Sequence, residues 1–464
     1  MSEAMTKPVV KDLRRFKPYP AYKESGIEWL GKIPAHWYVR RLKTIANVQL
    51  SNVDKKSVEG QELVRLCNYV DVYYNDRITP ELEFMAATAT PEQLRRFSLR
   101  AGDVLITKDS ESWTDIAVAA VVATDLPDVL CGYHLALVRP AFDCDGAFLA
   151  RAFSAVGPRD QFEVAANGIT RFGLGGDAIR TGLFATPPAQ EQRAIAAFLD
   201  RETERIDALV AKKERLIELL QEKRTALITR AVTKGLDPNV PMKDSGVEWL
   251  GEIPAHWEVK PLKAVSGLQT GMTLGKKFEG QTLVTRPYLR VANVQDGYFT
   301  LDDIAEAEVP RQDAARYELR KGDVLMTEGG DFDKLGRGHV WEAQVAGCLH
   351  QNHIFAVRPR RDMLRSYFLA HAMSSGYGRA YFTATSKQST NLASTNSTKL
   401  RNLPLPLPGL AEQDNIVSSI DRDTARVGSL IAKVRQAIDS LKELRTALIS
   451  AAVTGKIDLR EEVA

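Results

Sequence analysis

The chain has 464 residues, of which 44% are hydrophobic and 26% charged, a balance typical of a folded protein with several domains. Its formal net charge of only +3 excludes a protein that coats nucleic acid through overall charge, so any phosphate contact requires local basic surface. The four cysteines, Cys67, Cys131, Cys144 and Cys348, are too few for a disulfide framework. Neither an apolar run long enough to span a membrane nor a signal peptide is present, so we expect a cytoplasmic protein.

The first distinctive segment lies at residues 25–37 and reads SGIEWLGKIPAHW. It returns at residues 245–257 as SGVEWLGEIPAHW, 220 positions later. Its histidine, His36 or His256, is interpreted as a framework residue beside the tryptophan, with phosphate contact as the alternative.

Short β-rich runs separated by turn residues follow in each half, and one short helix is expected after them. The runs are 103–107, 117–122 and 134–138, then 340–345 and 353–357, and the helices are 148–155 and 367–374. Further blocks match at offsets of 219 to 221: 99–107 with 319–327, 133–140 with 352–359, and 224–228 with 445–449. We therefore interpret the chain as one structural unit that is duplicated.

The segments between these blocks diverge between the halves. Residues 45–98 share little with 265–318, and the loop KDSESWTDIA after residue 107 faces EGGDFDKLGR after residue 327. A constant framework with variable loops is what two related binding modules with different ligands would show.

A long helix is expected at the end of each half. Pro187 and Pro188 precede a run free of Pro and Gly that ends at Gly235, and Pro408 and Gly455 bracket its counterpart. The second helix carries apolar residues at steps of three and four: Val427, Leu430, Val434, Ala437, Leu441, Leu444 and Leu448. The offset of 221 places the first seam at Ile206, Leu209, Lys213, Leu216, Leu220, Lys223 and Leu227.

We expect the two seams to bury against each other. The pattern leaves the direction open, and the chain path favours antiparallel helices because the first helix must lead from one module to the other. A coiled coil that only spaces or dimerises the protein is the alternative.

Motifs of common catalytic sites are missing. No phosphate loop, HExxH, GxSxG or methyltransferase Asn/Asp-Pro-Pro-aromatic motif occurs. Glu258 and Lys260 have a nuclease-like spacing that we attribute to chance. Cys348, His350 and His353 lack a second ligand pair and are interpreted as strand residues rather than a metal site.

With these residues in view, the sequence resembles the specificity subunits of type I restriction-modification enzymes. The resemblance is carried by the two SG-x-EWLG-x-IPAHW segments, the two GDVL(I/M)T segments, the Pro-rich helix starts at 187–192 and 408–413, and the two RTALI helix ends. It covers roughly residues 20–460, and the duplicated order of module and helix is its most specific feature.

The resemblance implies an α+β fold with two globular α/β target-recognition domains, related by pseudo-two-fold symmetry and separated by two long antiparallel coiled-coil spacer helices. We expect a first recognition domain at 1–186, a first spacer helix at 187–235, a second domain at 236–407 and a second helix at 408–464.

The resemblance also implies a non-catalytic role. Each domain would read one half of a bipartite asymmetric site on double-stranded DNA, and the helices would set the spacer length and dock two methyltransferase subunits. The heptad section of about 22 residues would span roughly 33 Å at about 1.5 Å per residue, close to one turn of B-DNA. No cofactor is expected on this chain, whereas S-adenosylmethionine would bind the methyltransferase, and ATP and magnesium the restriction (motor-nuclease) subunits.

The divergent loops are the expected DNA-contacting segments, because base edges must be read by side chains. The candidates are Lys108, Ser110, Ser112 and Arg171 in the first module, and Lys334, Arg337, Lys387, Gln388 and Asn391 in the second. Gln and Asn suit adenine, whereas Arg and Lys suit guanine or phosphate. Solvated loop residues are the alternative interpretation.

Two other functions remain open. The chain could be an adaptor with two protein-binding modules on a coiled coil, which DNA-binding assays with the methyltransferase would exclude. It could also be a nuclease or methyltransferase with an unrecognised active site, which activity of the purified chain would reveal.

Overall fold

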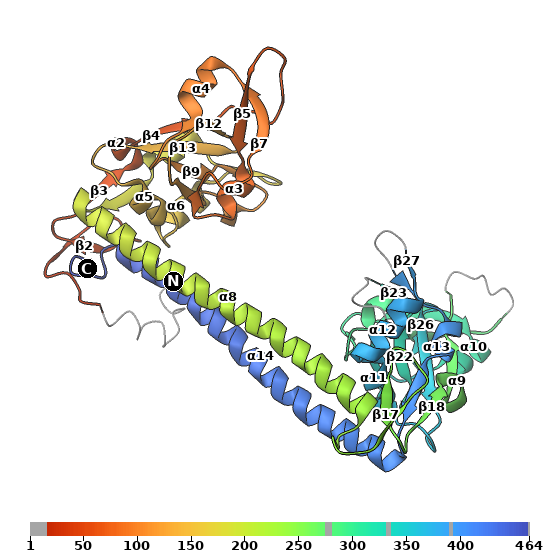
Figure 1. Cartoon of the computed structure of the whole chain (residues 1–464). Coiled ribbons are helices and arrows are strands. Elements are labelled where there is room, and N and C mark those ends of the chain that lie inside the picture. The colour runs from red at the N-terminus through yellow and green to blue at the C-terminus, as the bar shows by residue number, and fades with distance from the viewer. Residues whose placement is uncertain (1–15, 274–280, 331–335, 389–392, 463–464) are drawn as a thin grey trace. The chain divides into compact units, whose positions relative to one another are not determined.

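A computed structural model describes residues 16–273, 281–330, 336–388 and 393–462 (Figure 1). The chain forms two compact units: unit 1 comprises 1–214 and 435–464, and unit 2 comprises 215–434. Each unit therefore contains one copy of the repeat and a segment of each long helix. Helices and sheets occur in both, so the α+β prediction is confirmed.

Unit 1 is built on two sheets. Its strands are β1 (Tyr22–Glu24), β2 (Lys32–Pro34), β3 (Tyr38–Arg41), β4 (Ala46–Leu50), β5 (Glu62–Cys67), β6 (Arg77–Ile78), β7 (Met85–Ala89), β8 (Ser98–Leu99), β9 (Val104–Thr107), β10 (Asp109–Ser110), β11 (Ala119–Val122), β12 (Leu126–Cys131), β13 (Leu135–Pro140), β14 (Phe172–Gly173) and β15 (Leu183–Thr186). The larger sheet has the order β4-β13-β9-β11-β6 and the smaller one β7-β5-β12-β8.

Short helices connect and cover these strands. They are α2 (Leu42–Ile45), α3 (Tyr69–Tyr73), α4 (Pro91–Phe97), the 3-10 helix η1 (Trp113–Asp115), α5 (Gly146–Phe153), α6 (Pro158–Ala165) and α7 (Gly176–Thr181). The long helix α8 (Ala189–Lys234) follows and continues into unit 2.

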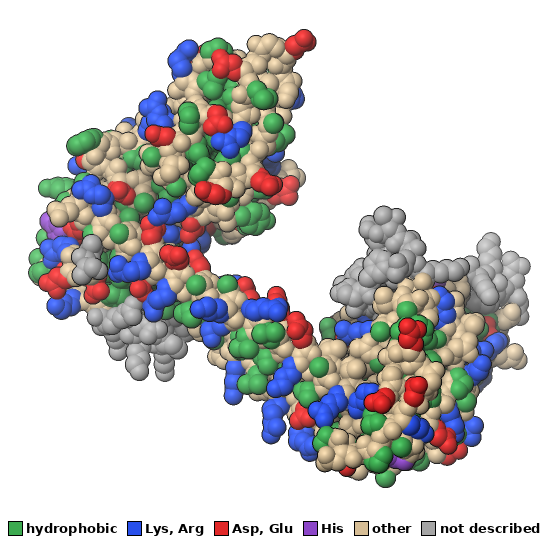
Figure 2. Space-filling view, in the orientation of Figure 1, with side chains coloured by type: hydrophobic (Ala, Val, Ile, Leu, Met, Phe, Trp, Pro, Cys, Tyr) green, Lys and Arg blue, Asp and Glu red, His purple; other side chains and the backbone are tan. Residues whose placement is uncertain are grey.

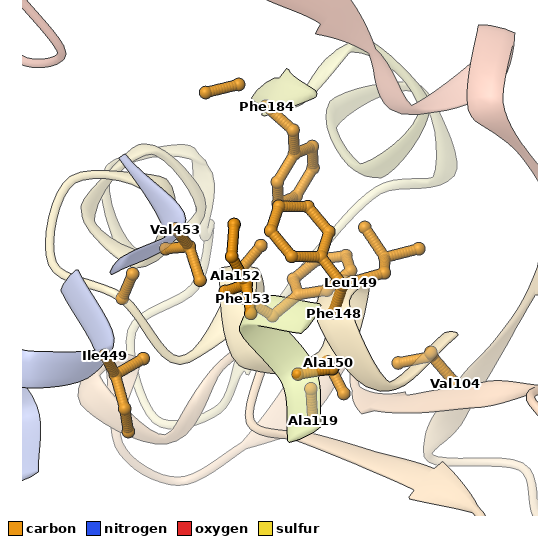
Figure 3. Packing of buried hydrophobic residues seen from close by; sticks show 14 of the residues in the cluster. Val104, Ala119, Phe148, Leu149, Ala150, Ala152, Phe153, Phe184, Ile449 and Val453 are labelled. Carbon is orange, nitrogen blue, oxygen red and sulfur yellow. The ribbon is translucent and has the colours of Figure 1, made fainter. Parts of the chain in front are cut away.

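The larger sheet of unit 1 is buried on both faces. On β9, Val104 and Ile106 belong to the cluster that contains α5, whereas Leu105 belongs to the cluster of the smaller sheet. This explains the continuous apolar run of β9, since a strand covered on both sides cannot alternate with polar residues. Around α5, Phe148 and Phe153 lie in one cluster with side chains from the end of the second long helix (Figure 3).

Unit 2 repeats this plan. Its strands are β16 (Met242–Asp244), β17 (Glu252–Pro254), β18 (Glu258–Pro261), β19 (Ser266–Thr270), β20 (Leu283–Leu289), β21 (Ala305–Pro310), β22 (Val324–Thr327), β23 (Gly329–Gly330), β24 (Gly338–Val340), β25 (Leu349–His350), β26 (Ile354–Pro359), β27 (Lys387–Gln388), β28 (Ala393–Ser394) and β29 (Pro404–Leu407). Its helices are α9 (Leu262–Val265), η2 (Val291–Asn293), α10 (Arg311–Tyr317), α11 (Ser366–Ser374), α12 (Gly376–Thr385), α13 (Ser397–Arg401) and the long α14 (Leu410–Val453).

The main sheet of unit 2 has the order β19-β26-β22-β24, which matches β4-β13-β9-β11 of unit 1. The repeated sequence blocks thus encode the same sheet. The strand expected at 340–345 is wrong beyond Val340, because β24 ends there. Ala343, three residues later, has a φ of 60°, a left-handed conformation that a strand does not tolerate.

The two long helices run antiparallel in each unit, as predicted (Figure 1). In unit 1 the start of α8 lies beside the end of α14, where Arg445 pairs with Asp207 at 3.1 Å. In unit 2 Ile228, near the end of α8, shares a buried cluster with Ile420, near the start of α14. The second helix ends at Val453, and Lys456 beyond it donates hydrogen bonds to the carbonyls of residues 30 and 32.

Three leucines assigned to the seam are exposed. Leu209, Leu216 and Leu430 have exposed fractions of 39%, 43% and 47%, whereas their neighbours Val210, Ile217 and Ile431 are half-buried. The buried side of each helix therefore continues from Ile206 or Val427 to the residue four positions later and then to the residue three positions after that. The sequence pattern predicted the opposite order, three positions and then four. Adjacent apolar residues made both phases compatible with the sequence. Hydrophobic side chains are accordingly visible between Lys and Arg on the helices (Figure 2).

The remaining seam candidates fall into two groups. Ile206, Val427 and Leu448 are buried, with exposed fractions of 5% or less. Those that are half-buried are Leu220, Leu227, Val434, Leu441 and Leu444.

The repeated PAHW segment receives the ends of both long helices. In unit 1, Glu191 at the start of α8 accepts hydrogen bonds from the Trp37 indole at 3.1 Å and from Tyr19 at 2.6 Å, and lies 2.8 Å from His36. Gly455, after α14, packs so closely that a Cβ would lie 2.3 Å from Pro34. His256 pairs with Glu412 in unit 2 in the same way, at 3.0 Å. These contacts place both histidines in the framework.

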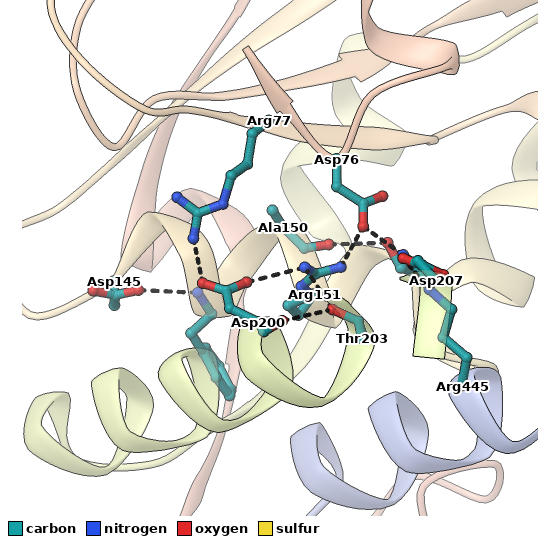
Figure 4. Close-up of polar contacts among 11 residues, drawn as sticks. Asp76, Arg77, Asp145, Ala150, Arg151, Asp200, Thr203, Asp207 and Arg445 are labelled. Carbon is teal, nitrogen blue, oxygen red and sulfur yellow. Dashed lines mark hydrogen bonds and ion pairs between the residues drawn. The ribbon is translucent and has the colours of Figure 1, made fainter. Parts of the chain in front are cut away.

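An ion-pair network joins the helices to the sheets in unit 1 (Figure 4). Arg151 of α5 contacts Asp76 at 2.7 Å and Asp200 of α8 at 3.0 Å, and Arg445 of α14 contacts Asp76 at 2.5 Å. Arg77 also pairs with Asp200. Burial alone would raise the pKa of Asp76, but Arg151 and Arg445 outweigh it and the pKa is lowered.

Unit 2 has a different arrangement at this junction. The sequence FLARA around Arg151 becomes FLAHA around His371, which lies 3.3 Å from Asp421 of α14. A cavity of about 180 Å³ lies beside His371, whereas the cavity beside Arg151 in unit 1 has about 10 Å³. Burial lowers the pKa of His371, an effect that Asp421 opposes.

Candidate nucleic-acid interface

Two distant segments of unit 1 meet at the first variable loop. β10 pairs antiparallel with β14, so that Asp109 faces Gly173 and Ser110 faces Phe172. The Leu174 amide donates a hydrogen bond to the Lys108 carbonyl at 2.8 Å. The structure thus brings Lys108 and Ser110 close to Arg171, which lies about sixty positions further along the sequence.

Charged side chains on this surface form a chain of contacts. The Lys108 Nζ lies 2.5 Å from Asp109 and 4.6 Å from the centre of the Tyr133 ring. His134 Nδ1 is 3.2 Å from the same Asp109 carboxylate, and Arg171 Nη2 is 3.0 Å from His134. Lys108 is therefore buried and neutralised, whereas Arg171 is exposed and can reach a ligand.

The two serine candidates shape the loop. Ser110 is 7% exposed, and its Oγ lies 3.2 Å from the Tyr69 hydroxyl. Ser112 caps η1 by accepting a hydrogen bond from the Thr114 amide at 3.3 Å. Both hydroxyls already have partners within unit 1.

The variable loop of unit 2, which follows residue 327, also pairs with a segment from later in the chain. β23 pairs with β28, and β28 pairs with β27, which carries Lys387 and Gln388. Arg337 is half-buried, and its Nη1 lies 3.5 Å from the side-chain amide oxygen of Gln295. Its Nε is buried and has no hydrogen-bond partner among the described residues. The candidates Lys334 and Asn391 lie outside the described residues.

A histidine–carboxylate pair occurs at the root of both variable loops. His353 Nδ1 lies 2.6 Å from Glu328, at the position that corresponds to His134 beside Asp109. The sequence contained the signal, since both histidines precede a matched strand, but only the fold places an acid beside each. This shared pair suits a ligand feature that is common to both units.

The other polar motifs form no catalytic site. His350 is fully buried, and burial lowers its pKa to about 4. Within the described ranges, no three His, Cys, Asp or Glu side chains are placed to hold a metal ion. Glu258 and Lys260 pair with each other at 2.7 Å on the surface strand β18. No helix in the part of the chain that the structure describes combines the length and apolarity needed to cross a membrane.

Comparison with known proteins identifies curated relatives of low identity. No family profile matches the sequence. The specificity subunit of the putative type I restriction enzyme MjaX of Methanocaldococcus jannaschii is 24% identical over 202 residues, covering 43% of this chain and 46% of the relative. The EcoKI specificity subunit of Escherichia coli is 24% identical over 276 residues, covering 58% and 57%. The matches thus span about half the length of these relatives.

Solved structures resemble the chain over most of its length. The HsdS subunit of Thermoanaerobacter tengcongensis has a TM-score of 0.53 at 18% identity, covering 92% of this chain and 98% of that one. A chain from a study of assembly and conformational transition in a type I R-M system has a TM-score of 0.66 at 20% identity, covering 91% and 98%. The resemblance to type I specificity subunits and the fold that it implies are confirmed.

Proposed function

We propose that this chain is the DNA-recognition subunit of a type I restriction-modification complex. The observation that carries the proposal is the pair of variable-loop surfaces, built on one repeated framework within a single chain. A repeated framework supplies the same docking geometry twice, and different loops supply different base preferences. Each recognition domain, 1–186 or 236–407, would thus read one half of a bipartite asymmetric site.

The contacts divide into two kinds. Arg171 is exposed beside His134 and offers a cation to phosphate in unit 1, and the matching His353 of unit 2 is exposed beside Glu328 and offers a ring nitrogen as a hydrogen-bonding group. Phosphate contacts fix register without reading sequence. Arg337 and Gln295 differ from their counterparts in unit 1 and suit guanine and adenine edges, respectively.

The long helices would set the distance between the two half-sites. Helices α8 and α14 run without interruption over 46 and 44 residues. Their exposed leucines, Leu209, Leu216 and Leu430, offer apolar surface to methyltransferase subunits. Two such subunits would dock there and bind S-adenosylmethionine, and restriction subunits using ATP and magnesium would complete the complex. The chain itself would be non-catalytic.

The substitution Arg337→Ala tests whether each recognition domain contacts only one half-site. The affinity of the complex with methyltransferase for its site is expected to fall about tenfold or more, since a good base contact contributes about 1–3 kcal/mol. Footprinting should show weaker protection of one half-site only. The matched variant Arg171→Ala should weaken the other half. Equal weakening of both halves by either variant would contradict the proposal.

Lengthening the helices tests their role as spacer. Seven residues inserted at corresponding positions of α8 and α14 add about 10.5 Å, the rise of about three base pairs. Methylation mapping should then find the same two half-sites with about three more unread base pairs between them. An unchanged spacing would refute the spacer role while leaving half-site reading intact.

A further inference from the structure

Aromatic side chains gather beside the first variable loop. Tyr69 and Tyr73 belong to α3, Tyr74 follows it, and Trp113 lies on η1 within the loop itself. Tyr74 is 77% exposed and Trp113 49% exposed. A cluster of exposed rings, unlike a single exposed ring, commonly marks a contact site.

The three tyrosine rings are fixed in place. Tyr69 and Tyr73 stack with centroids 5.4 Å apart and an interplanar angle of 16°, and Tyr74 meets Tyr73 edge-on at 5.0 Å. Hydroxyl contacts then tie α3 to the loop: Tyr69 lies 3.2 Å from Ser110, and Tyr73 donates to Asp115 at 3.3 Å. A ligand therefore meets a prearranged surface, and little ordering cost opposes binding.

In unit 2, the described short helix at the corresponding place, η2 (Val291–Asn293), carries no aromatic side chain. The helix η2 of unit 2 starts in the same way as α3 of unit 1. The Asn68 amide donates a hydrogen bond to the Asp71 carboxylate at 2.6 Å before α3, and the Arg290 amide donates one to the Asn293 side chain at 2.8 Å before η2. By this register Val291 stands where unit 1 has Tyr69, and Gln295 stands where it has Tyr73. Gln295 lies beside Arg337. At these two positions unit 1 thus has the rings of Tyr69 and Tyr73, whereas unit 2 has an aliphatic side chain and an amide that lies beside the Arg337 guanidinium.

The surroundings of the rings favour DNA as the occupant. The loop that carries Trp113 is joined through β10 and β14 to the exposed Arg171, which suits a phosphate backbone. The indole N–H of Trp113 and the hydroxyl of Tyr74 are each a single polar group, and most of the surface that the two rings offer is apolar. The one apolar group that the major groove displays is the C5-methyl of thymine, which protein side chains read by apolar contact.

We infer, resting on the proposed function, that Trp113 and Tyr74 contact thymine methyl groups in the half-site read by unit 1. Unit 2 reads its half-site through hydrogen bonds from Gln295 and Arg337. The two domains therefore differ in the chemistry of recognition as well as in sequence preference.

Replacement of thymine by uracil tests this inference, because it removes only the methyl group. Methylation mapping first defines the site, and Arg337→Ala identifies the half read by unit 2. Fluorescence anisotropy of the complex with methyltransferase then compares duplexes that carry uracil in one half or the other. Each contacted methyl removed from the unit 1 half should lower affinity about threefold to fourfold, with no change for the other half.

Variants connect the effect to the rings. Trp113→Ala should lower affinity for the normal site and reduce the uracil effect, and Trp113→Ala combined with Tyr74→Ala should abolish it, whereas Trp113→Phe should retain it. Phe142→Ala is the matched control, because Phe142 is a fully exposed ring at the opposite end of β13. Site-specific binding that uracil leaves unchanged, a uracil effect that is equal in both halves, or a unit 1 half-site without an A·T pair would overturn the inference but not the proposed function. Absence of any bipartite methylated site would overturn both.

Discussion

The ion-pair network of unit 1 predicts a large effect for Arg151→Met, which keeps the stem of the side chain and removes its charge. Arg151 has a side chain that is 10% exposed, and it loses contacts to Asp76 at 2.7 Å, Asp200 at 3.0 Å and Thr203 at 3.2 Å. Removing one partner of a buried pair costs about 3–5 kcal/mol. Since each carboxylate keeps a second arginine, Arg445 or Arg77, we expect about 3 kcal/mol.

Urea unfolding, followed by hydrogen exchange of peptides from α5 and β9, reports unit 1 separately from unit 2. The control Arg205→Met removes the exposed partner of a single ion pair with Glu202 on α8 and should cost about 1 kcal/mol or less. The pKa of Asp76 is lowered in the folded state, so its contribution is present above the unfolded value of about 4 and lost as pH falls through the folded pKa. The difference between variant and parent should therefore shrink below about pH 4. A loss under about 1 kcal/mol at pH 7 would refute the reasoning.

Three further predictions concern the framework. Glu191→Ala should cost about 2–3 kcal/mol in urea unfolding, because it leaves the buried Trp37 and Tyr19 donors unpaired. Glu412→Ala should cost under about 1 kcal/mol, because Glu412 pairs with the exposed His256, and similar losses in the two variants would contradict this difference. Gly455→Ala should lower the melting temperature, since its φ is +71° and the new Cβ would lie 2.3 Å from Pro34; an unchanged melting temperature would contradict that packing. Unit 2 should lose stability as pH falls from about 6.5 towards 4, because burial lowers the folded-state pKa of His339, His371 and His350, the last to about 4. Hydrogen exchange at pH 7 and 4.5 should show this loss in β25 and α11, and equal protection at both pH values would contradict it.

The framework could be predicted from the sequence because its signals are repeated. The IPAHW segments, the GDVL strands and the helix starts occur twice at a nearly constant offset, so each copy confirms the other. Helix direction also followed from chain connectivity. The sequence did not show which residues of the long helices are buried in the seam. At Leu209–Val210, Leu216–Ile217 and Leu430–Ile431 two adjacent residues are apolar, so either one could have been the seam residue.

The candidate interface could be placed only in part. The variable loops led to Arg171, which the structure leaves exposed, and to Arg337, which it leaves half-buried, and their contact with DNA stays a prediction. Lys108 is neutralised by Asp109, and Ser110 is buried against Tyr69, two contacts that depend on strand pairing between distant segments. Tyr74 and Trp113 escaped notice because an aromatic residue in a sequence is more often part of a core.

The central claim is that one chain carries two unlike DNA-reading surfaces on a common framework. Single-molecule methylation sequencing tests it most directly, in cells that express the methyltransferase with either the normal chain or one whose loops at 108–116 and 167–173 are replaced by those of a relative. We predict one bipartite methylated motif for the normal chain, and for the exchanged chain a motif in which one half is new and the other is unchanged. Methylation without a bipartite motif, or a change in both halves at once, would contradict the account.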